Sequence, residues 1–232
     1  MNKRPILFST PMVQALLDGR KTQTRRIATH PLIFGNPRVE QIVLDGGDWW
    51  TGIDGGGGFS IKCPYGKVGD LLYVRERFCW KWIEAKSSFE GFYYYADGQE
   101  VFHVDGFDKS PWKPSIHMPR AASRLTLEIT DIRVERLQDI SDDDAFSEGL
   151  EYHKSGDSME GDLAYYFKDY LCKGIEADDD GEKIIYNNTF SDDPIASYKT
   201  LWESINGKDS WAANPWVWVV EFKVHKKNID NL

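Results

Sequence analysis

The pattern that most constrains this chain is an alternation of apolar and polar residues in the segment 123–137. Leu125, Leu127 and Ile129 recur there at every second position, which is the period of a β-strand with one buried face. The segment 215–224, rich in tryptophan and valine, is the strongest strand candidate of the chain. Further strand-like segments are 4–9, 59–63, 71–78, 91–96 and 101–104. Many strands with few helices predict an α+β, mainly β fold whose strands form a compact barrel.

Three helices are expected, each with recognisable start or stop signals. The first is capped by Thr10, has a proline at its first helical position and ends at Gly19. The second and third cover 141–149 and 194–206, and each begins at or just after a serine or aspartate that can cap it. The inward stripe expected on the third helix consists of Ile195, Tyr198, Leu201, Trp202 and Ile205. The basic segment that follows Gly19 is therefore placed at a junction between a helix and a strand.

Residues 30–58 have the composition of a loop. They contain the dipeptides His30-Pro31, Asn36-Pro37 and Gly46-Gly47, and four consecutive glycines occupy 55–58. Trp49 and Trp50 lie inside this segment and need an explanation. We expect them to anchor the loop on the core, with a surface for stacking bases as the alternative.

The chain has 232 residues, of which 41% are hydrophobic, and this size fits a single domain with a good core. No run of about 18 apolar residues is present, so we expect no membrane-spanning helix. The first apolar run is too short for a signal peptide, and three widely spaced cysteines fit a reducing cytoplasm. The five histidines form no pair at helical spacing. We expect neither a metal nor a cofactor.

The net charge of −9 is unevenly distributed along the chain. Residues 139–193 contain 17 acidic and 4 basic side chains, whereas residues 1–38 contain seven lysines and arginines and a single acid, Asp18. Four of these cations stand within eight residues, Gly19 to Arg26. Such a local basic field favours an anionic partner. The alternative is that the cluster only solvates the surface and interacts with the negative end of the preceding helix.

The motif Gly19-x-Lys21-x-x-Thr24-x-Arg26, between a short helix and a strand, resembles the signature of the ASCH domain family, which belongs to the PUA-like superfamily. Many members have glutamate where this chain has Thr24. The segments 68–78, 127–149 and 216–224 also resemble the family, while 80–113 and 151–190 resemble insertions into a single domain that spans 1–232. Because the segment 151–190 is acidic and weakly patterned, we expect it to lie on the surface. The longer form, with Ser-Ile-His-Met-Pro-Arg before the central strand, is similar to proteins of phages and prophages.

The resemblance implies a small β-barrel with flanking helices and a cleft that binds RNA or nucleosides. It also implies a catalytic set, because a similar bacterial subgroup hydrolyses acetylcytidine with a lysine, a threonine and a glutamate. These roles fall on Lys21, Thr24 and Glu148. Amide hydrolysis needs a nucleophile, a base and a stabilised intermediate. Lys21 can act as the base if burial and the neighbouring arginines lower its pKa.

Six further residues are expected to bind the nucleic acid or nucleoside: Arg20, Arg25, Arg26, Glu76, His117 and Arg120. Glu76 alternates with apolar residues and so points inward, where a carboxylate commonly pairs with a buried cation, for which Arg26 is the candidate. The alternative for His117 is an ordinary loop histidine without a role in the site.

Three functions remain open from the sequence. The first is an RNA-binding or nucleoside-binding protein that holds a base against aromatic and cationic walls. The second is a hydrolase, either an amidohydrolase acting on acylated cytidine or a ribonuclease. The third is a phage accessory protein that binds a host protein through the acidic segment 151–190. The oligomeric state is left open.

Overall fold

The computed structural model of the protein describes residues 2–30, 33, 39–45, 48–54, 56–83, 88–98, 112–155, 164–171, 176–177, 183–184 and 190–232. Within these residues the fold is mainly β with few helices, as the sequence predicts. The helices are α1 (Thr10–Leu17), α2 (Asp142–Ser147) and α3 (Pro194–Asn206). No helix in these ranges is long and apolar enough to cross a membrane.

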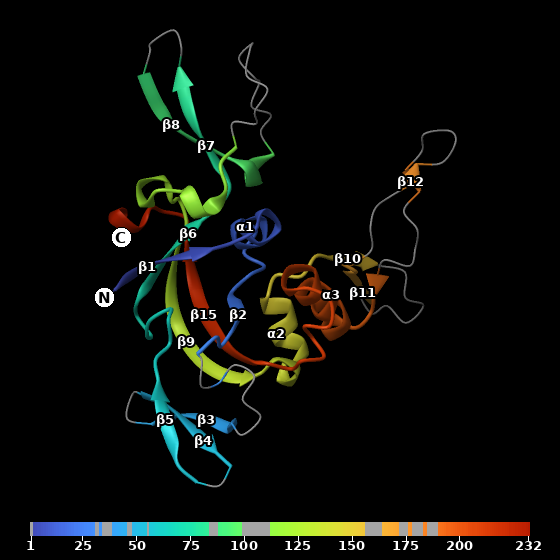
Figure 1. Cartoon of the computed structure of the whole chain (residues 1–232). Coiled ribbons are helices and arrows are strands. Elements are labelled where there is room, and N and C mark those ends of the chain that lie inside the picture. Colours follow the sequence, from blue (N-terminus) through green and yellow to red (C-terminus); the bar gives the residue numbers. More distant parts are fainter. Residues whose placement is uncertain are drawn as a thin grey trace.

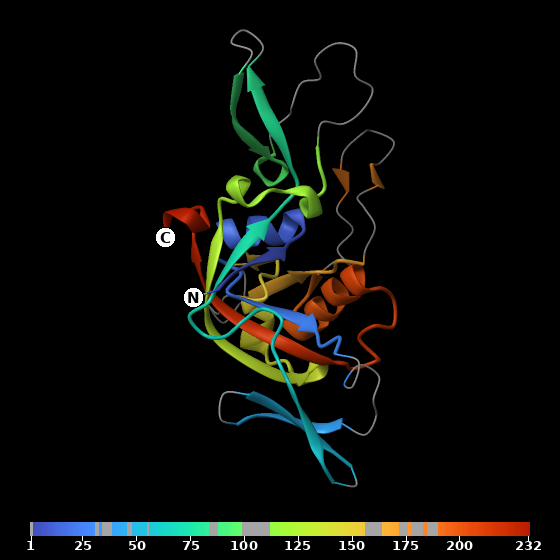
Figure 2. The same ribbon diagram turned by 60° about the vertical axis from the view of Figure 1, so that its left-hand side comes forward.

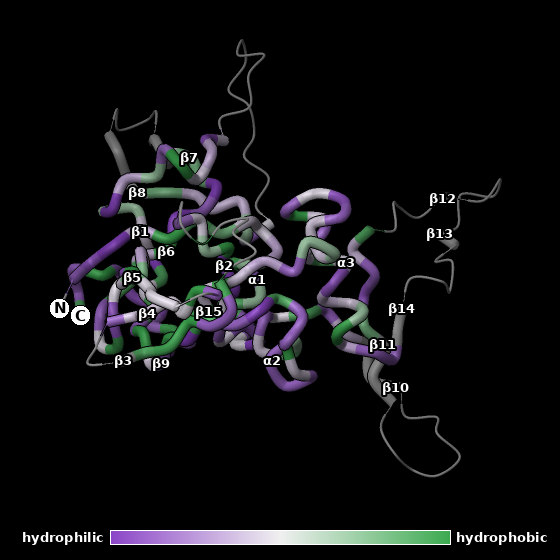
Figure 3. The backbone as a smooth tube through the Cα atoms, turned by 60° about the horizontal axis from the view of Figure 1, so that its bottom comes forward, coloured by the Kyte–Doolittle hydropathy of each residue, from purple (hydrophilic) through white to green (hydrophobic). Residues whose placement is uncertain are grey.

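A five-stranded sheet forms the centre of the molecule (Figure 1). Its strands, in spatial order, are β1 (Lys3–Leu7), β6 (Leu71–Arg75), β9 (Thr126–Arg136), β15 (Trp216–His225) and β2 (Gln23–Ile27). The β1–β6 pair is parallel and the other pairs are antiparallel. Figure 3 shows hydrophobic stretches where these strands run together. Since β1 and β2 are the two edges in the described pairings, the sheet is not seen as a closed barrel.

The two strongest strand predictions are confirmed. The alternating segment 123–137 contains β9, and the segment 215–224 contains β15. β15 is the strand between β9 and β2, and four consecutive residues of it, 217–220, are buried. Burial on both faces accounts for the unbroken apolar run, because a strand covered on both sides needs no polar alternation.

The helix signals also hold, with a shift of one residue in α1. The cap of α1 is Ser9 rather than Thr10, which is the first helical residue. The Ser141 side chain accepts a hydrogen bond from the backbone N–H of Asp144 and so caps α2. Asp193 caps α3 in the same way, through the first two N–H groups after Pro194. Capping side chains therefore set where α2 and α3 begin.

The prediction of a loop over 30–58 is wrong for 39–45, 48–53 and 58, while Gly56 and Gly57, with positive φ, do lie in the connection between two strands. The segment contributes to a three-stranded antiparallel sheet of β3 (Val39–Asp45), β4 (Asp48–Ile53) and β5 (Gly58–Ile61), which projects from the lower end of the molecule in Figure 1. Gly52 of β4 is paired with Gly58 of β5, and a Cβ on Gly58 would lie 2.1 Å from the Thr51 carbonyl oxygen. Glycine serves here for close backbone approach rather than for a turn.

The two tryptophans of β4 differ in environment. Trp49 is half-buried and meets Trp218 of β15 edge to face, with 5.4 Å between ring centroids. Trp50, on the opposite face of the strand, is exposed. The expectation of a core anchor is confirmed for Trp49 and wrong for Trp50. Successive residues of a strand point to opposite faces, so only one of the pair can reach the core.

The segment 80–113 is described only in part. β7 (Phe78–Ile83) and β8 (Ser88–Tyr94) pair as a hairpin that projects from the end of the molecule opposite to β3–β5 (Figure 2). The strand expected at 101–104 lies outside the described residues. That this segment is an insertion remains a prediction.

The segment 151–190 is not wholly peripheral. It contributes β10 (Tyr152–Ser155), β11 (Ala164–Lys168) and β14 (Phe190–Ser191), which form a small sheet, and the two-residue strands β12 (Glu176–Ala177) and β13 (Lys183–Ile184). Phe167 of β11 is 1% exposed, belongs to the main core and packs edge to face on Phe146. The expectation that the whole segment lies on the surface is therefore wrong at Phe167.

Replacing Phe167 by alanine should lower the free energy of unfolding by about 3–5 kcal/mol, because a buried aromatic ring is lost and a cavity remains. The matched control is Leu171→Ala, since Leu171 follows the same strand and is 48% exposed. Urea denaturation measures both. Equal, small effects of the two substitutions would show that β11 does not belong to the core.

Candidate functional site

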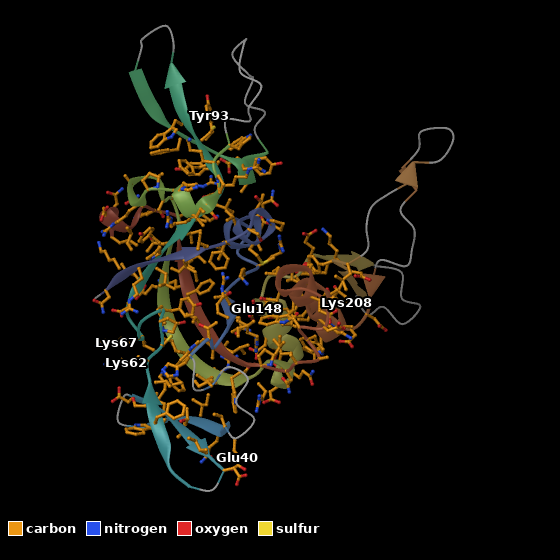
Figure 4. The ribbon with its side chains drawn as sticks, in the orientation of Figure 1. Glu40, Lys62, Lys67, Tyr93, Glu148 and Lys208 are labelled. Atoms are coloured by element: carbon orange, nitrogen blue, oxygen red, sulfur yellow. The ribbon has the colours of Figure 1, made fainter. Side chains whose placement is uncertain are left out.

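A pocket of about 370 Å³ lies where the end of β1, helix α1, strand β2 and helix α3 meet. Its wall includes Lys21, Thr24 and Glu148, which the sequence proposes as a catalytic set. Figure 4 shows Glu148 in the middle of the molecule, between β2 and the helices α2 and α3. The structure thus brings together three residues that span 128 positions of the chain.

The turn after α1 positions Lys21. The backbone N–H groups of Arg20 and Lys21 both donate to the Ala15 carbonyl, at 2.9 and 3.1 Å, so the chain folds back tightly on the end of the helix. Lys21 then forms an isolated β-bridge with Glu148. Gly149 permits this contact: its φ is +89°, and a Cβ there would lie 2.8 Å from the Cβ of Lys21. A larger residue at 149 would push the two segments apart.

Lys21 and Glu148 form a buried ion pair. The Lys21 Nζ donates to Glu148 Oε2 at 2.8 Å and to the Glu148 backbone carbonyl at 2.8 Å, and the two residues are 2% and 4% exposed. Burial lowers the pKa of Lys21, and the Glu148 carboxylate opposes this effect. Arg26 and Arg25 lower the Lys21 pKa further. The sequence expected this direction and these causes, although Arg20 is not among them.

Arg25 is surrounded by carboxylates. Its side chain has no exposed surface, and it donates to Glu148 Oε1 at 3.2 Å, Glu135 Oε1 at 2.5 Å and Asp144 Oδ2 at 2.7 Å. Arg133 holds the same Asp144 and Glu135 from the other side, at 2.8 and 3.1 Å. Burial alone would lower the pKa of Arg25, but the carboxylates outweigh it and the pKa is raised. Arg25 therefore orients Glu148 and has no surface to offer to an RNA backbone.

Thr24 lies on β2 opposite Val220 of β15 and is buried. It lines the pocket together with Lys21 and Glu148. Within the described chain its hydroxyl makes no side-chain hydrogen bond. Activation of a hydroxyl as a nucleophile needs a base within hydrogen-bond reach. Lys21 and Glu148 border the same pocket as Thr24, but within the described residues their side-chain hydrogen bonds go to other partners.

The two outer arginines of the motif have different surroundings. Arg20 pairs with Asp18 at 2.9 Å and donates to the Gly149 carbonyl at 2.8 Å, and it is not part of the pocket wall. Arg26 does line the pocket. It donates to the Leu7 carbonyl at 2.7 Å and lies over the Phe8 ring, 5.1 Å from the centroid.

Glu76, His117 and Arg120 lie outside the pocket wall. Glu76 is buried, as its alternation predicts, but its partner is Arg124, at 2.9 and 3.0 Å, and not Arg26. The expected pairing fails because β9 and β15 lie between β6, which leads to Glu76, and β2. His117 is exposed at the end of a short 3₁₀ turn, and Arg120 forms an ion pair with Asp230 near the C-terminus.

Helix α3 supplies a wall that the sequence did not assign to the site. Of the five residues expected as its inward stripe, Tyr198, Leu201 and Trp202 are buried and line the pocket. The expectation is wrong for Ile205, which is 57% exposed. Burial, with the Glu148 carboxylate nearby, raises the pKa of Tyr198 well above its usual value. Phe8 and Tyr65 add two more aromatic side chains. In the sequence, only the aromatic residues of this stripe could have indicated a pocket wall. A stripe that packs in the core contains the same kinds of residues, so the two cannot be distinguished.

Several buried N–H donors of the pocket wall have no partner. Among the described residues, no hydrogen bond is made by Arg25 Nε, Arg26 Nε or Trp202 Nε1. All three side chains belong to residues that line the pocket. An unpaired buried donor is unfavourable, and these three donors belong to residues that border the same pocket.

No match came from comparisons of the chain with protein-family models, with curated proteins or with solved structures. The described residues contain no group of three or more His, Cys, Asp or Glu side chains arranged to hold a metal ion. The pocket is therefore the feature of the molecule from which a function can be inferred.

Replacing Glu148 by glutamine should lower the free energy of unfolding at pH 7 by about 3–5 kcal/mol, because Lys21 is left as a buried charge without its partner. The matched control is Glu151→Gln, which breaks the half-exposed pair of Glu151 with Lys168, at 2.9 Å, and should cost about 1 kcal/mol or less. Urea denaturation of the three proteins gives the comparison. Equal costs would show that the Lys21–Glu148 pair is not buried in solution.

The Glu148→Gln defect should also shrink as the pH rises. The pKa of Lys21 in the folded state is lowered from 10.5, and losing the carboxylate lowers it further. Between that lowered value and 10.5 the unfolded chain binds more protons, so the stability of the variant increases with pH. Denaturation curves from pH 7 to 10 measure this effect, and a gap to the parent protein that does not change with pH would contradict it.

Proposed function

We propose that this protein binds a single nucleoside in the pocket beside Lys21. The observation that carries the proposal is the combination of aromatic walls with buried N–H donors that lack partners. A nucleobase has two flat faces for aromatic contacts and ring acceptors for N–H donors. The volume of about 370 Å³ is near the lower end of the range for small-ligand pockets, which favours one nucleoside over a longer ligand.

The charges in the motif favour a nucleoside over an RNA strand. Binding along a phosphate backbone needs several cations free to replace counterions. Arg20 is paired with Asp18, Lys21 with Glu148, and Arg25 with three carboxylates. The cluster that is prominent in the sequence is thus largely neutralised within the fold.

A second candidate function, hydrolysis of an acylated cytidine, is favoured by the contact of Lys21 with Glu148 beside Thr24. In this reaction the Thr24 oxygen attacks the acyl carbonyl, and neutral Lys21 takes the hydroxyl proton and passes it to the departing cytosine amine. Water, oriented by Glu148, then cleaves the acyl ester on Thr24 and releases the acid. The lowered pKa of Lys21 increases the neutral fraction that this step needs.

We also propose that the chain is a member of the ASCH domain family. The support is the order of elements: the motif begins just after α1 and continues into β2, and its lysine contacts the glutamate at the end of α2. In this proposal the central sheet corresponds to the family barrel, with β1 and β2 as the strands on either side of its opening.

Isothermal titration calorimetry with the four ribonucleosides and acetylcytidine tests the binding proposal. Trp202→Phe keeps an aromatic ring but removes the unpaired N–H, and it should weaken binding up to about tenfold. Trp216→Phe is the matched control, because the Trp216 Nε1 is also buried without a partner but lies outside the pocket wall. The proposal fails if no nucleoside binds, or if both variants bind as the parent does.

Incubation with acetylcytidine, followed by chromatography, tests the second candidate. Cytidine and acetate should form, and Thr24→Val and Lys21→Met should each remove nearly all activity, as expected for groups that act together. The rate should rise with pH towards the lowered pKa of Lys21. Thr29→Val is the control, since Thr29 lines the same pocket. A Thr24→Val variant as active as the parent would rule out this mechanism.

A further inference from the structure

The charges of the pocket wall do not balance. Its cations are Lys21, Arg25 and Arg26, and Glu148 is the sole acid among the residues that line it. Both oxygens of Glu148 are already used, Oε2 by Lys21 and Oε1 by Arg25. Arg25 has further carboxylate partners in Glu135 and Asp144. Within the described chain, Arg26 is the pocket cation without a carboxylate partner.

Arg26 is held in a defined position. It lies on β2 opposite Trp218, one of its terminal nitrogens donates to the Leu7 carbonyl at 2.7 Å, and its guanidinium covers the Phe8 ring. Burial raises the pKa of Tyr65, and Arg26 opposes this effect, which places its charge near another residue of the pocket wall. The Arg26 Nε is buried and unpaired. A guanidinium that is fixed in position and has no carboxylate partner within the described residues is suited to an anionic group of a ligand.

We propose that the ligand of this pocket carries a phosphate group that binds Arg26, so that the preferred ligand is a nucleoside monophosphate rather than an uncharged nucleoside. This inference rests on the proposed nucleoside site. Phosphate is the anion that nucleosides carry, and an arginine side chain binds it through two parallel N–H donors. The pocket volume limits the ligand to about one nucleotide, either free or at the end of an RNA strand.

Calorimetry with cytidine, cytidine 5′-monophosphate, cytidine 3′-monophosphate and inorganic phosphate tests the inference. One monophosphate should bind about tenfold more tightly than cytidine, and Arg26→Gln should abolish this difference in affinity between the two ligands. Raising the salt concentration should weaken the monophosphate and leave cytidine unaffected. A dicytidine carrying the same terminal phosphate distinguishes the two sources: affinity similar to the monophosphate indicates a strand end, and much weaker affinity a free nucleotide.

The matched control is Arg77→Gln. Arg77 also lies over an aromatic ring, that of Tyr95 at 4.0 Å, but it is not part of the pocket wall. Its substitution should leave both affinities unchanged. Equal affinity of cytidine and both monophosphates, or a phosphate preference that survives in Arg26→Gln, would overturn the inference and leave the nucleoside site intact. If no probe binds, the proposed function fails together with the inference.

Discussion

The ion pair between Lys21 and Glu148 is the interaction on which the pocket depends. It joins the turn after α1 to the end of α2, and the backbone N–H of Thr22 strengthens the junction by donating to the Ser147 carbonyl at 2.9 Å. Two charges removed from water are stable only while both are present and hydrogen-bonded. Lys21 satisfies this condition by donating to both the carboxylate and the backbone carbonyl of Glu148. The wall of the pocket and the contact between two distant segments are thus the same structural feature.

Next to this pair, a network of ion pairs between arginines and carboxylates connects β2, β9, β15 and α2. Arg25 of β2 and Arg133 of β9 share Asp144 and Glu135, and Arg133 also binds Glu221 of β15. A polar network in which each member has partners fixes the orientation of all of them. The same network explains why a cluster that is basic in the sequence does not form a basic surface.

The sequence predicts elements better than contacts. Alternation identified β9, and capping side chains identified α2 and α3, because these signals act over a few residues. The segment 30–58 was misread because Gly52 and Gly58 serve close packing within a sheet, which composition does not distinguish from a turn. The candidate site required the family resemblance, since no local pattern relates Lys21 to Glu148, 127 positions away. The walls from α3 were predicted as core, and only the fold shows that they border a pocket.

The position of β15 in the sheet affects when the site can fold during synthesis of the chain. β2 carries Thr24, Arg25 and Arg26, but its neighbour in the sheet is β15, which follows every other strand in the chain. Nearly two hundred residues are synthesised after β2 before β15 begins. In a nascent chain that stops before β15, the motif strand lacks its neighbour in the sheet. The strand that carries Thr24 and Arg26 is therefore among the last parts of the sheet to be completed during synthesis.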